Sequence, residues 1–146
     1  MNRLKFLEQL DAEWDAFKRS FVGLSDDDIV EPVIGSWSTR DLIGHVATWD
    51  GECVKSARLK IDGKDDLEYE EGFNDEQVVE KRELSMRALM KDLEDSHRLV
   101  QSFIETAPEQ SLSQETSVGS LIHGETYLHY AEHGKSIRDW RAQHGK

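Results

Sequence analysis

The chain has 146 residues, a formal net charge of −12 from 30 acidic and 18 basic side chains, and one cysteine. This length predicts one domain over residues 1–146, and the acidic charge would repel a phosphate backbone or an anionic membrane, so we expect neither nucleic acid nor membrane as a partner. Because no long apolar segment or signal core is seen, we expect a cytoplasmic protein. The lone Cys53 excludes an internal disulfide and does not argue against a reducing compartment.

The first predicted helix covers residues 2–22. Its apolar side chains recur at alternating steps of three and four and lie on one helical stripe: Leu7, Leu10, Trp14, Phe17 and Phe21. The segment 23–28 ends this pattern, and Pro32 and Gly35 keep the connection irregular as far as Trp37. We therefore expect a long connection without a strand.

The second predicted helix begins after Ser38. This residue stands three positions before Asp41, which is the spacing of a capping box. The helix then places an apolar set on one side: Leu42, His45, Val46, Trp49 and Cys53. The pattern fades near residues 61–64, and the acidic segment 65–72 predicts a loop.

Two further helices are predicted, one from Asn74 to residue 107 and one from Ser117 to Trp140. The first carries an apolar stripe of Met86, Leu89, Leu93, Val100 and Phe103, and the polar residues 109–116 form a linker. The inner stripe of the last helix consists of Ile122, Thr126, His129, His133, Ile137 and Trp140. Four amphipathic helices without an internal repeat predict an all-α four-helix bundle whose helix order stays open.

Three histidines on these inner stripes are candidate metal ligands. His129 and His133 are four residues apart, so their imidazoles lie about one turn apart along the helix and point to the same side of it. His45, on the stripe of another helix, supplies the third ligand. Neutral imidazoles suit zinc, nickel, copper or iron, and three ligands leave a coordination position open, so the residues alone do not choose the metal. The H-x-x-x-H spacing alone is a weak signal, and the alternative is that His133 is a partly exposed helix histidine and His45 a hydrogen-bonded core residue.

Other side chains near the predicted ligands have candidate supporting roles. Asp41 and Thr126 each precede a predicted ligand by about one turn and are candidates to orient the imidazoles, although capping is the alternative for Asp41. His123 lies six residues before His129, points well around the helix, and is excluded as a ligand. Pocket candidates are two aromatic residues, for which core packing is the alternative, and two acidic ones: Trp37, Trp49, Glu52 and Glu125.

Two segments resemble the DinB/YfiT-like superfamily. Residues 36–49, with the sequence SWSTRDLIGHVATW, are similar to the W-[ST]-x-x-D-x-x-x-H signature that opens the second helix of that superfamily. Residues 126–133 are similar to the H-x-x-x-H of its last helix, and the Gly72-Phe73-Asn74 segment also matches related sequences. Together these matches extend over nearly the whole chain.

The resemblance implies a four-helix bundle of up-down-down-up order, often a homodimer, that holds nickel or zinc on His45, His129 and His133. Relatives include transferases and isomerases that use bacillithiol, mycothiol or glutathione, whereas colibactin-resistance-like branches do not depend on metal in the same way. We expect a metal-dependent transfer of a low-molecular-weight thiol to a small electrophile, in detoxification or stress response. The alternatives are a metal-dependent hydrolase and a non-catalytic protein that sequesters a small toxic molecule.

Overall fold

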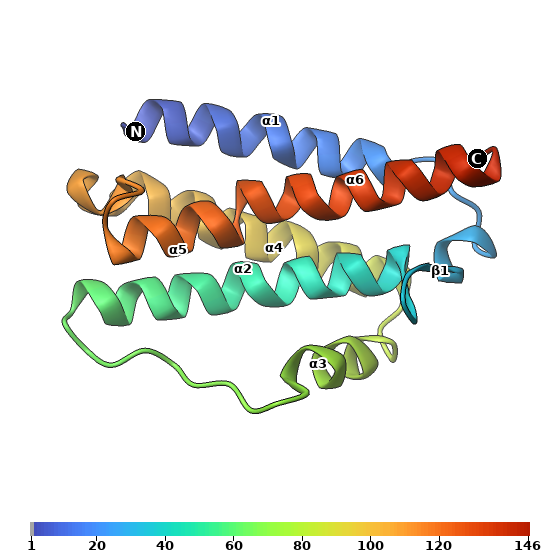
Figure 1. Ribbon diagram of the computed structural model, residues 1–146, viewed down its shortest axis with the longest axis horizontal. Helices are drawn as coiled ribbons and strands as arrows, with labels where there is room; N and C mark the ends of the chain where they lie inside the picture. The colour runs from blue at the N-terminus through green and yellow to red at the C-terminus, as the bar shows by residue number, and fades with distance from the viewer. Residues whose placement is uncertain (1) are drawn as a thin grey trace.

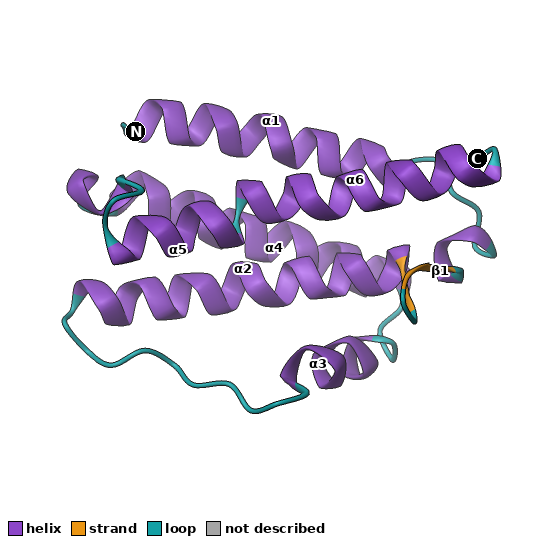
Figure 2. Ribbon diagram, in the orientation of Figure 1, coloured by secondary structure: helices purple, strands orange, loops and turns teal. Residues whose placement is uncertain are grey.

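The computed structural model describes residues 2–146, which form an all-α four-helix bundle with a very small sheet (Figures 1 and 2). Helices α1, α2 and α4 and the consecutive pair α5–α6 occupy the four positions of the bundle, while α3 packs on α2 outside it. The helices are α1 (Arg3–Phe21), α2 (Thr39–Ile61), α3 (Phe73–Lys81), α4 (Met86–Thr106), α5 (Ser117–Glu125) and α6 (Tyr127–His144). The predicted fold class is confirmed.

Hydrogen bonds between helix ends fix the relative directions of the helices. The Arg141 guanidinium near the end of α6 donates to the Val22 carbonyl at the end of α1 over 2.8 Å. Arg3, at the start of α1, donates to the Ile104 carbonyl near the end of α4 over 3.0 Å. Helices α1 and α6 therefore run in one direction, and α4 runs in the opposite direction together with α2 (Figure 1).

The starts of the first two helices follow the sequence pattern. Asn2 caps α1 by accepting a hydrogen bond from the Lys5 amide over 2.9 Å. At α2 the predicted capping box is present, because the Asp41 amide donates to Ser38 Oγ over 3.2 Å and the Ser38 amide donates to Asp41 Oδ2 over 3.0 Å. Such caps satisfy backbone N–H groups that have no partner inside the helix.

The connection between α1 and α2 corrects the expectation of no strand. It contains a short 3₁₀ helix (Asp28–Val30) and two antiparallel strands, β1 (Pro32–Ile34) and β2 (Trp37–Ser38). Gly35 has a φ of 54° and closes the turn between the strands. Strands this short leave no alternating pattern in a sequence, so the prediction missed them.

The predicted third helix is in fact two helices. Helix α3 starts after Gly72, which has a left-handed φ of 87°, and not at a cap on Asn74. Helix α4 starts at its own cap, where Ser85 accepts a hydrogen bond from the Ala88 amide over 3.1 Å. The serine side chain competes for backbone groups and starts a new helix, while the apolar stripe beyond it belongs to α4 alone.

The predicted last helix is broken at Thr126. Its φ and ψ of −112° and −100° are not helical, and its hydroxyl donates to the Ile122 carbonyl four residues earlier. A threonine that bonds back to the preceding turn bends a helix, so α6 begins anew at Tyr127. The predicted linker 109–116 also contains a short 3₁₀ helix, Glu109–Leu112. The break places His129 in the first turn of α6.

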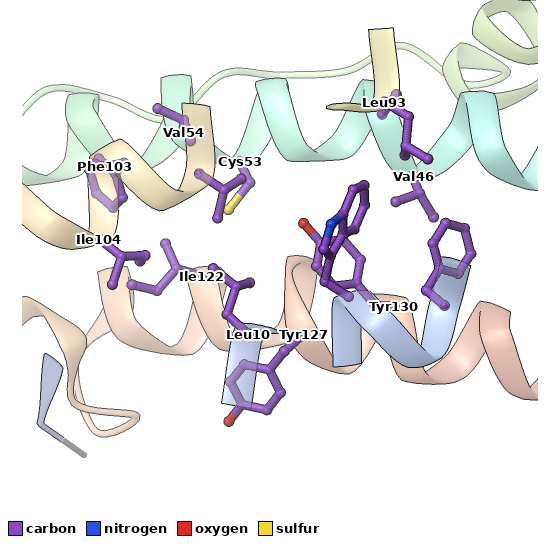
Figure 3. Packing of buried hydrophobic residues seen from close by; sticks show 14 of the residues in the cluster. Leu10, Val46, Cys53, Val54, Leu93, Phe103, Ile104, Ile122, Tyr127 and Tyr130 are labelled. Atoms are coloured by element: carbon purple, nitrogen blue, oxygen red, sulfur yellow. The ribbon is translucent and has the colours of Figure 1, made fainter. Parts of the chain in front are cut away.

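The hydrophobic core lies between the four bundle positions (Figure 3). Large side chains with almost no exposed surface come from each of them, among them Phe6, Leu10, Leu42, Ile43, Leu89, Leu93, Ile122 and Ile137. Cys53 lies in this core, where burial first and the nearby Asp50 and Glu125 carboxylates next raise the pKa of its thiol well above 9.0. The thiol is therefore held protonated, and a buried protonated thiol is a poor nucleophile.

Candidate metal centre

The three predicted ligands come together between α2 and α6. His45 lies in the second turn of α2, just beyond the capping box, and His129 and His133 lie in the first turns of α6. The Nε2 atom of His129 is 3.0 Å from Nε2 of His45 and 2.9 Å from Nε2 of His133. All three residues are buried, with 7%, 8% and 8% of their surface exposed.

Hydrogen bonds alone do not account for this arrangement. A neutral imidazole nitrogen carries either one proton or one in-plane lone pair, so it serves as a donor or as an acceptor but not as both. His129 Nε2 faces two other Nε2 atoms, and only one of these contacts can be a good hydrogen bond. A cation shared by three lone pairs would satisfy all three nitrogens at once.

The local environment keeps the three imidazoles neutral. Burial lowers the pKa of His45 to about 4 and that of His129 to about 2, with further lowering by the neighbouring histidines. Burial also lowers the pKa of His133, although Glu132 opposes the shift. Neutral imidazole is the form that binds metal ions, so at pH 7 no ligand proton has to be displaced.

The donor set fits one divalent ion. Nitrogen ligands bound at about 2.0–2.1 Å to one ion lie roughly 3 Å from each other. The ligand atoms of the three histidines all lie within 4.8 Å of one another. The structure thus brings together three side chains that are close enough to bind one metal ion, all of them nitrogen donors.

The outer nitrogens of two rings have no protein partner. Nδ1 of His129 and Nδ1 of His133 are buried and lack a hydrogen bond from any of residues 2–146. Histidines that bind metal usually donate this second N–H to a carboxylate, a carbonyl group or water. The sequence predicts that Asp41 and Thr126 take this orienting role.

Asp41 and Thr126 have other partners. The Asp41 carboxylate accepts hydrogen bonds from the Ser38 amide and, over 3.0 Å each, from Nε and Nη2 of Arg82. Burial alone would raise the pKa of Asp41, but these hydrogen bonds and the Arg82 charge together lower it below 3.8. Capping, the alternative considered for Asp41, is confirmed, and the Thr126 hydroxyl bonds to the backbone of Ile122.

Only one of the two aromatic pocket candidates lies beside the centre. The Trp37 ring is 4.8 Å from the His45 ring, and its indole N–H donates to Asp75 over 3.0 Å. The Trp49 indole N–H donates to Asn74 over 2.7 Å, and its ring packs on Tyr69 at 5.0 Å under the loop before α3. Trp49 therefore anchors α3 to α2.

The two acidic pocket candidates lie in different surroundings. Glu52 accepts hydrogen bonds from Lys55 over 3.2 Å and from the Tyr69 hydroxyl over 3.3 Å. Glu125, at the end of α5, is half-buried, and burial together with the Glu132 charge raises its pKa above 4.5. In the described part of the chain neither carboxylate is hydrogen-bonded to a histidine of the centre.

A second buried polar cluster, which no pattern in the sequence predicts, lies next to the centre. Tyr130 donates a hydrogen bond to Asp50 over 2.8 Å, and its oxygen lies 2.9 Å from Nδ1 of His97. The His97 ring stacks on Trp14 at 3.9 Å. These residues come from four different helices, so no local spacing in the sequence could have paired them.

An all-α bundle with a buried three-histidine centre between α2 and α6 defines a class of helical proteins with a candidate metal site. The model of the DinB superfamily matches residues 9–135, and the chain belongs to this superfamily. The family resemblance found in the sequence is therefore confirmed. No curated protein matches the chain.

Several solved structures share the fold. The sibling lethal factor precursor DfsB has a TM-score of 0.82 at 15% identity over 99% of this chain and 97% of its own. An uncharacterised protein from Escherichia coli UTI89 has a TM-score of 0.77 at 17% identity over 99% and 95%. The colibactin self-resistance protein ClbS, in complex with double-stranded DNA, has a TM-score of 0.81 at 13% identity over 97% and 96%.

The ClbS complex corrects one expectation. We excluded nucleic acid as a partner on the net charge of −12, but a protein of this fold has been crystallised with double-stranded DNA. Net charge sums over the whole surface and does not describe the local potential at a binding face, so the exclusion was wrong. Among residues 2–146, no helix combines the length and apolar composition needed to cross a lipid bilayer.

Proposed function

We propose that His45, His129 and His133 bind one divalent metal ion, nickel or zinc, and that the protein transfers a low-molecular-weight thiol to a small electrophile. The observation that supports the metal site is the contact of three neutral Nε2 atoms, at 3.0 and 2.9 Å, which hydrogen bonding cannot satisfy. The thiol chemistry is the finer part of the proposal and rests on the family resemblance.

The residues of the chain have separate roles in this proposal. The three imidazoles bind the ion, which would lower the pKa of a coordinated thiol and supply a Lewis acid. Because all three ligands are neutral, they leave the positive charge of the ion uncompensated, which favours an anionic thiolate. The Trp37 ring packs on the His45 ring and so lies on one side of the centre.

Elemental analysis tests the metal site first. Protein purified without an affinity tag or chelator is expected to carry about one nickel or zinc ion per chain, the ratio for a single mononuclear site. His129→Ala is expected to carry none. The matched control is His144→Ala, which makes the same change at an exposed position of the same helix and keeps the metal. A wild-type protein that stays metal-free after incubation with both ions contradicts the proposal.

Turnover assays then test the reaction. Metal-loaded protein is mixed with a haloarene or an epoxide and with bacillithiol, mycothiol or glutathione in turn, and thioether formation is measured. Turnover with one of the thiols, lost in His129→Ala, supports the transferase. Hydrolysis of an ester or amide without any thiol would instead support a metal-dependent hydrolase acting through bound hydroxide.

A second candidate function is the binding of a small toxic molecule without turnover. It is supported by the fold neighbour ClbS, whose name describes self-resistance to colibactin. This candidate requires stoichiometric ligand binding in metal-free protein and no product. A parallel titration with a labelled DNA duplex at low salt tests whether the DNA contact of ClbS extends to this chain.

A further inference from the structure

One buried side chain from each of the four bundle positions contributes to a connected cluster. Trp14 comes from α1, Asp50 from α2, His97 from α4 and Tyr130 from α6. The Trp14 and His97 rings are stacked with an interplanar angle of 3°. Tyr130 then links His97 to Asp50 through contacts of 2.9 and 2.8 Å. We call these residues the core quartet.

Burying the polar groups of the core quartet costs folding free energy. Asp50 and Tyr130 have no exposed surface, and His97 has 3%. Asp50 Oδ1 and His97 Nε2 are buried without a hydrogen-bond partner in residues 2–146. Buried polar groups that lack partners destabilise a fold, and apolar residues of similar shape would pack this position with less cost.

The position of the quartet suggests its role. Asp50 lies five residues after His45 on α2, and Tyr130 is the neighbour of His129 on α6. Helix α2 packs mainly on α4, and α6 packs mainly on α1, so the two helices that carry the candidate ligands have little direct packing with each other. The Tyr130–Asp50 hydrogen bond connects these two helices directly.

We propose that Asp50 and His97 hold Tyr130 in place and thereby position His129 and His133 opposite His45. Asp50 and His97 are positioning residues in this proposal, since neither touches the candidate metal site. A ligand set must be held to within a fraction of an ångström to bind an ion well, and the supporting residues supply that precision. The effect on metal affinity rests on the proposed function, whereas the effect on ring position does not.

Tyr127 provides a matched control on the same helix. Its hydroxyl oxygen lies 2.6 Å from Nδ1 of His123, which resembles the contact between Tyr130 and His97. Figure 3 shows Tyr130 pointing toward α2 and Tyr127 pointing away from it. Tyr127→Phe and Tyr130→Phe therefore each remove a tyrosine hydroxyl group from α6. Only Tyr130→Phe removes the hydrogen bond to Asp50 that connects α6 to α2.

The first measurement uses metal-loaded protein. Affinity is determined by competition with a chelator, and the absorption spectrum of the cobalt-substituted protein reports the ligand geometry. We expect Tyr130→Phe to bind about tenfold more weakly, at the lower end of outer-shell effects, with altered cobalt bands. Tyr127→Phe is expected to keep the wild-type affinity and spectrum. Equal effects in the two variants, or none in Tyr130→Phe, would overturn the proposal.

The second measurement uses metal-free protein and separates the two proposals. Ring ¹H–¹⁵N NMR signals of His45, His129 and His133 are expected to shift or broaden in Tyr130→Phe and to stay unchanged in Tyr127→Phe. If the wild-type chain binds no metal, the proposed function fails, but these ring signals still decide the present inference. Unchanged signals in Tyr130→Phe would contradict it.

Two further variants guard against a simple loss of folding. Asp50→Asn keeps an acceptor for the Tyr130 hydroxyl, so we expect it to retain the wild-type ring signals and cobalt bands. If these signals and bands change as much as in Tyr130→Phe, the proposal is contradicted. If Tyr130→Phe does not fold, His97→Phe replaces it, because it keeps a ring on Trp14 and removes one contact of Tyr130. Folded His97→Phe with unchanged ring signals overturns the proposal.

Discussion

Two buried histidine regions lie on the α5–α6 side of the bundle and differ in what their nitrogens face. His123 has Nδ1 2.6 Å from the Tyr127 hydroxyl and Nε2 2.8 Å from the Leu112 carbonyl, so both ring nitrogens meet oxygen atoms. In the three-histidine centre, the Nε2 atom of His129 meets only other imidazole nitrogens. Burial is similar in the two regions, so the partners of the nitrogens, not burial, separate a structural histidine from a candidate ligand.

The same contrast appears in the pKa values. Burial lowers the pKa of His123, but the hydrogen bond to the Leu112 carbonyl works against that shift. For His129 burial is joined by the neighbouring His133 and His45, which lower the pKa further, to about 2. The Leu112 carbonyl can only accept a hydrogen bond and so favours a proton on Nε2 of His123, whereas the facing nitrogens of the centre favour lone pairs. A cation suits the second region and not the first.

The largest expected effect is a loss of stability on substitution of a glycine in α5, the helix that carries His123. Gly119, at the start of α5, would place an added Cβ 1.7 Å from the Ser113 carbonyl oxygen, a backbone atom that cannot move aside alone. We expect Gly119→Ala to lower the free energy of unfolding by about 4 kcal/mol or more, in the exceptional range for one substitution. Urea unfolding measures this. The control is Gly124→Ala in the same helix, where nothing lies within 4 Å; equal stability in both variants would contradict the contact.

The next effect concerns the centre. Metal at 100 times its dissociation constant should stabilise the wild-type protein by about 2.7 kcal/mol. His129→Ala should lose this metal-dependent gain, because it removes the central ligand. Thermal unfolding with and without nickel or zinc measures it. A full metal-dependent gain in His129→Ala would mean that the ion binds elsewhere.

His123→Ala should give the opposite pattern. It removes a buried ring and two hydrogen bonds, so we expect a loss of about 2 kcal/mol in unfolding free energy. The metal-dependent gain should stay intact, because His123 faces the Leu112 and Tyr127 oxygens. Together with His129→Ala, this variant tests whether the two regions are independent. Loss of metal binding in folded His123→Ala would show that they are coupled.

The smallest effect is the pH dependence of the cap that precedes His45. The pKa of Asp41 is lowered in the folded protein, so its stabilising contribution is present above the unfolded value near 3.8 and is lost as the pH falls through the folded value. Asp41→Asn should cost about 1 kcal/mol at pH 7, because it removes the charge that pairs with Arg82 and with the positive end of α2. The difference between wild type and variant should shrink below about pH 4. A difference in stability that stays constant down to pH 2 would disprove the role of the carboxylate charge.

The sequence by itself determined the local features. The apolar stripe of α1, the capping box at Ser38 and Asp41, and the H-x-x-x-H pair of α6 each depend on residues within one or two turns. The pairing of His45 with His129 could be predicted because all three histidines fall on apolar stripes and the bundle has one interior. The helix breaks at Ser85 and Thr126 could not be predicted, because the apolar pattern continues through both positions. A serine or threonine at a single position does not by itself indicate a break.

Contacts between helices were decided only in the tertiary structure. Trp49 lies on the same stripe as His45, yet its indole binds Asn74 across a loop that carries no pattern. Asp50 and His97 are paired through Tyr130 because the packing of three helices sets their separation, and no spacing along the chain encodes that distance. The periodicity of a helix predicts which of its faces is buried. Which side chains of a neighbouring helix contact that face depends on the rotation and the axial offset of the neighbour.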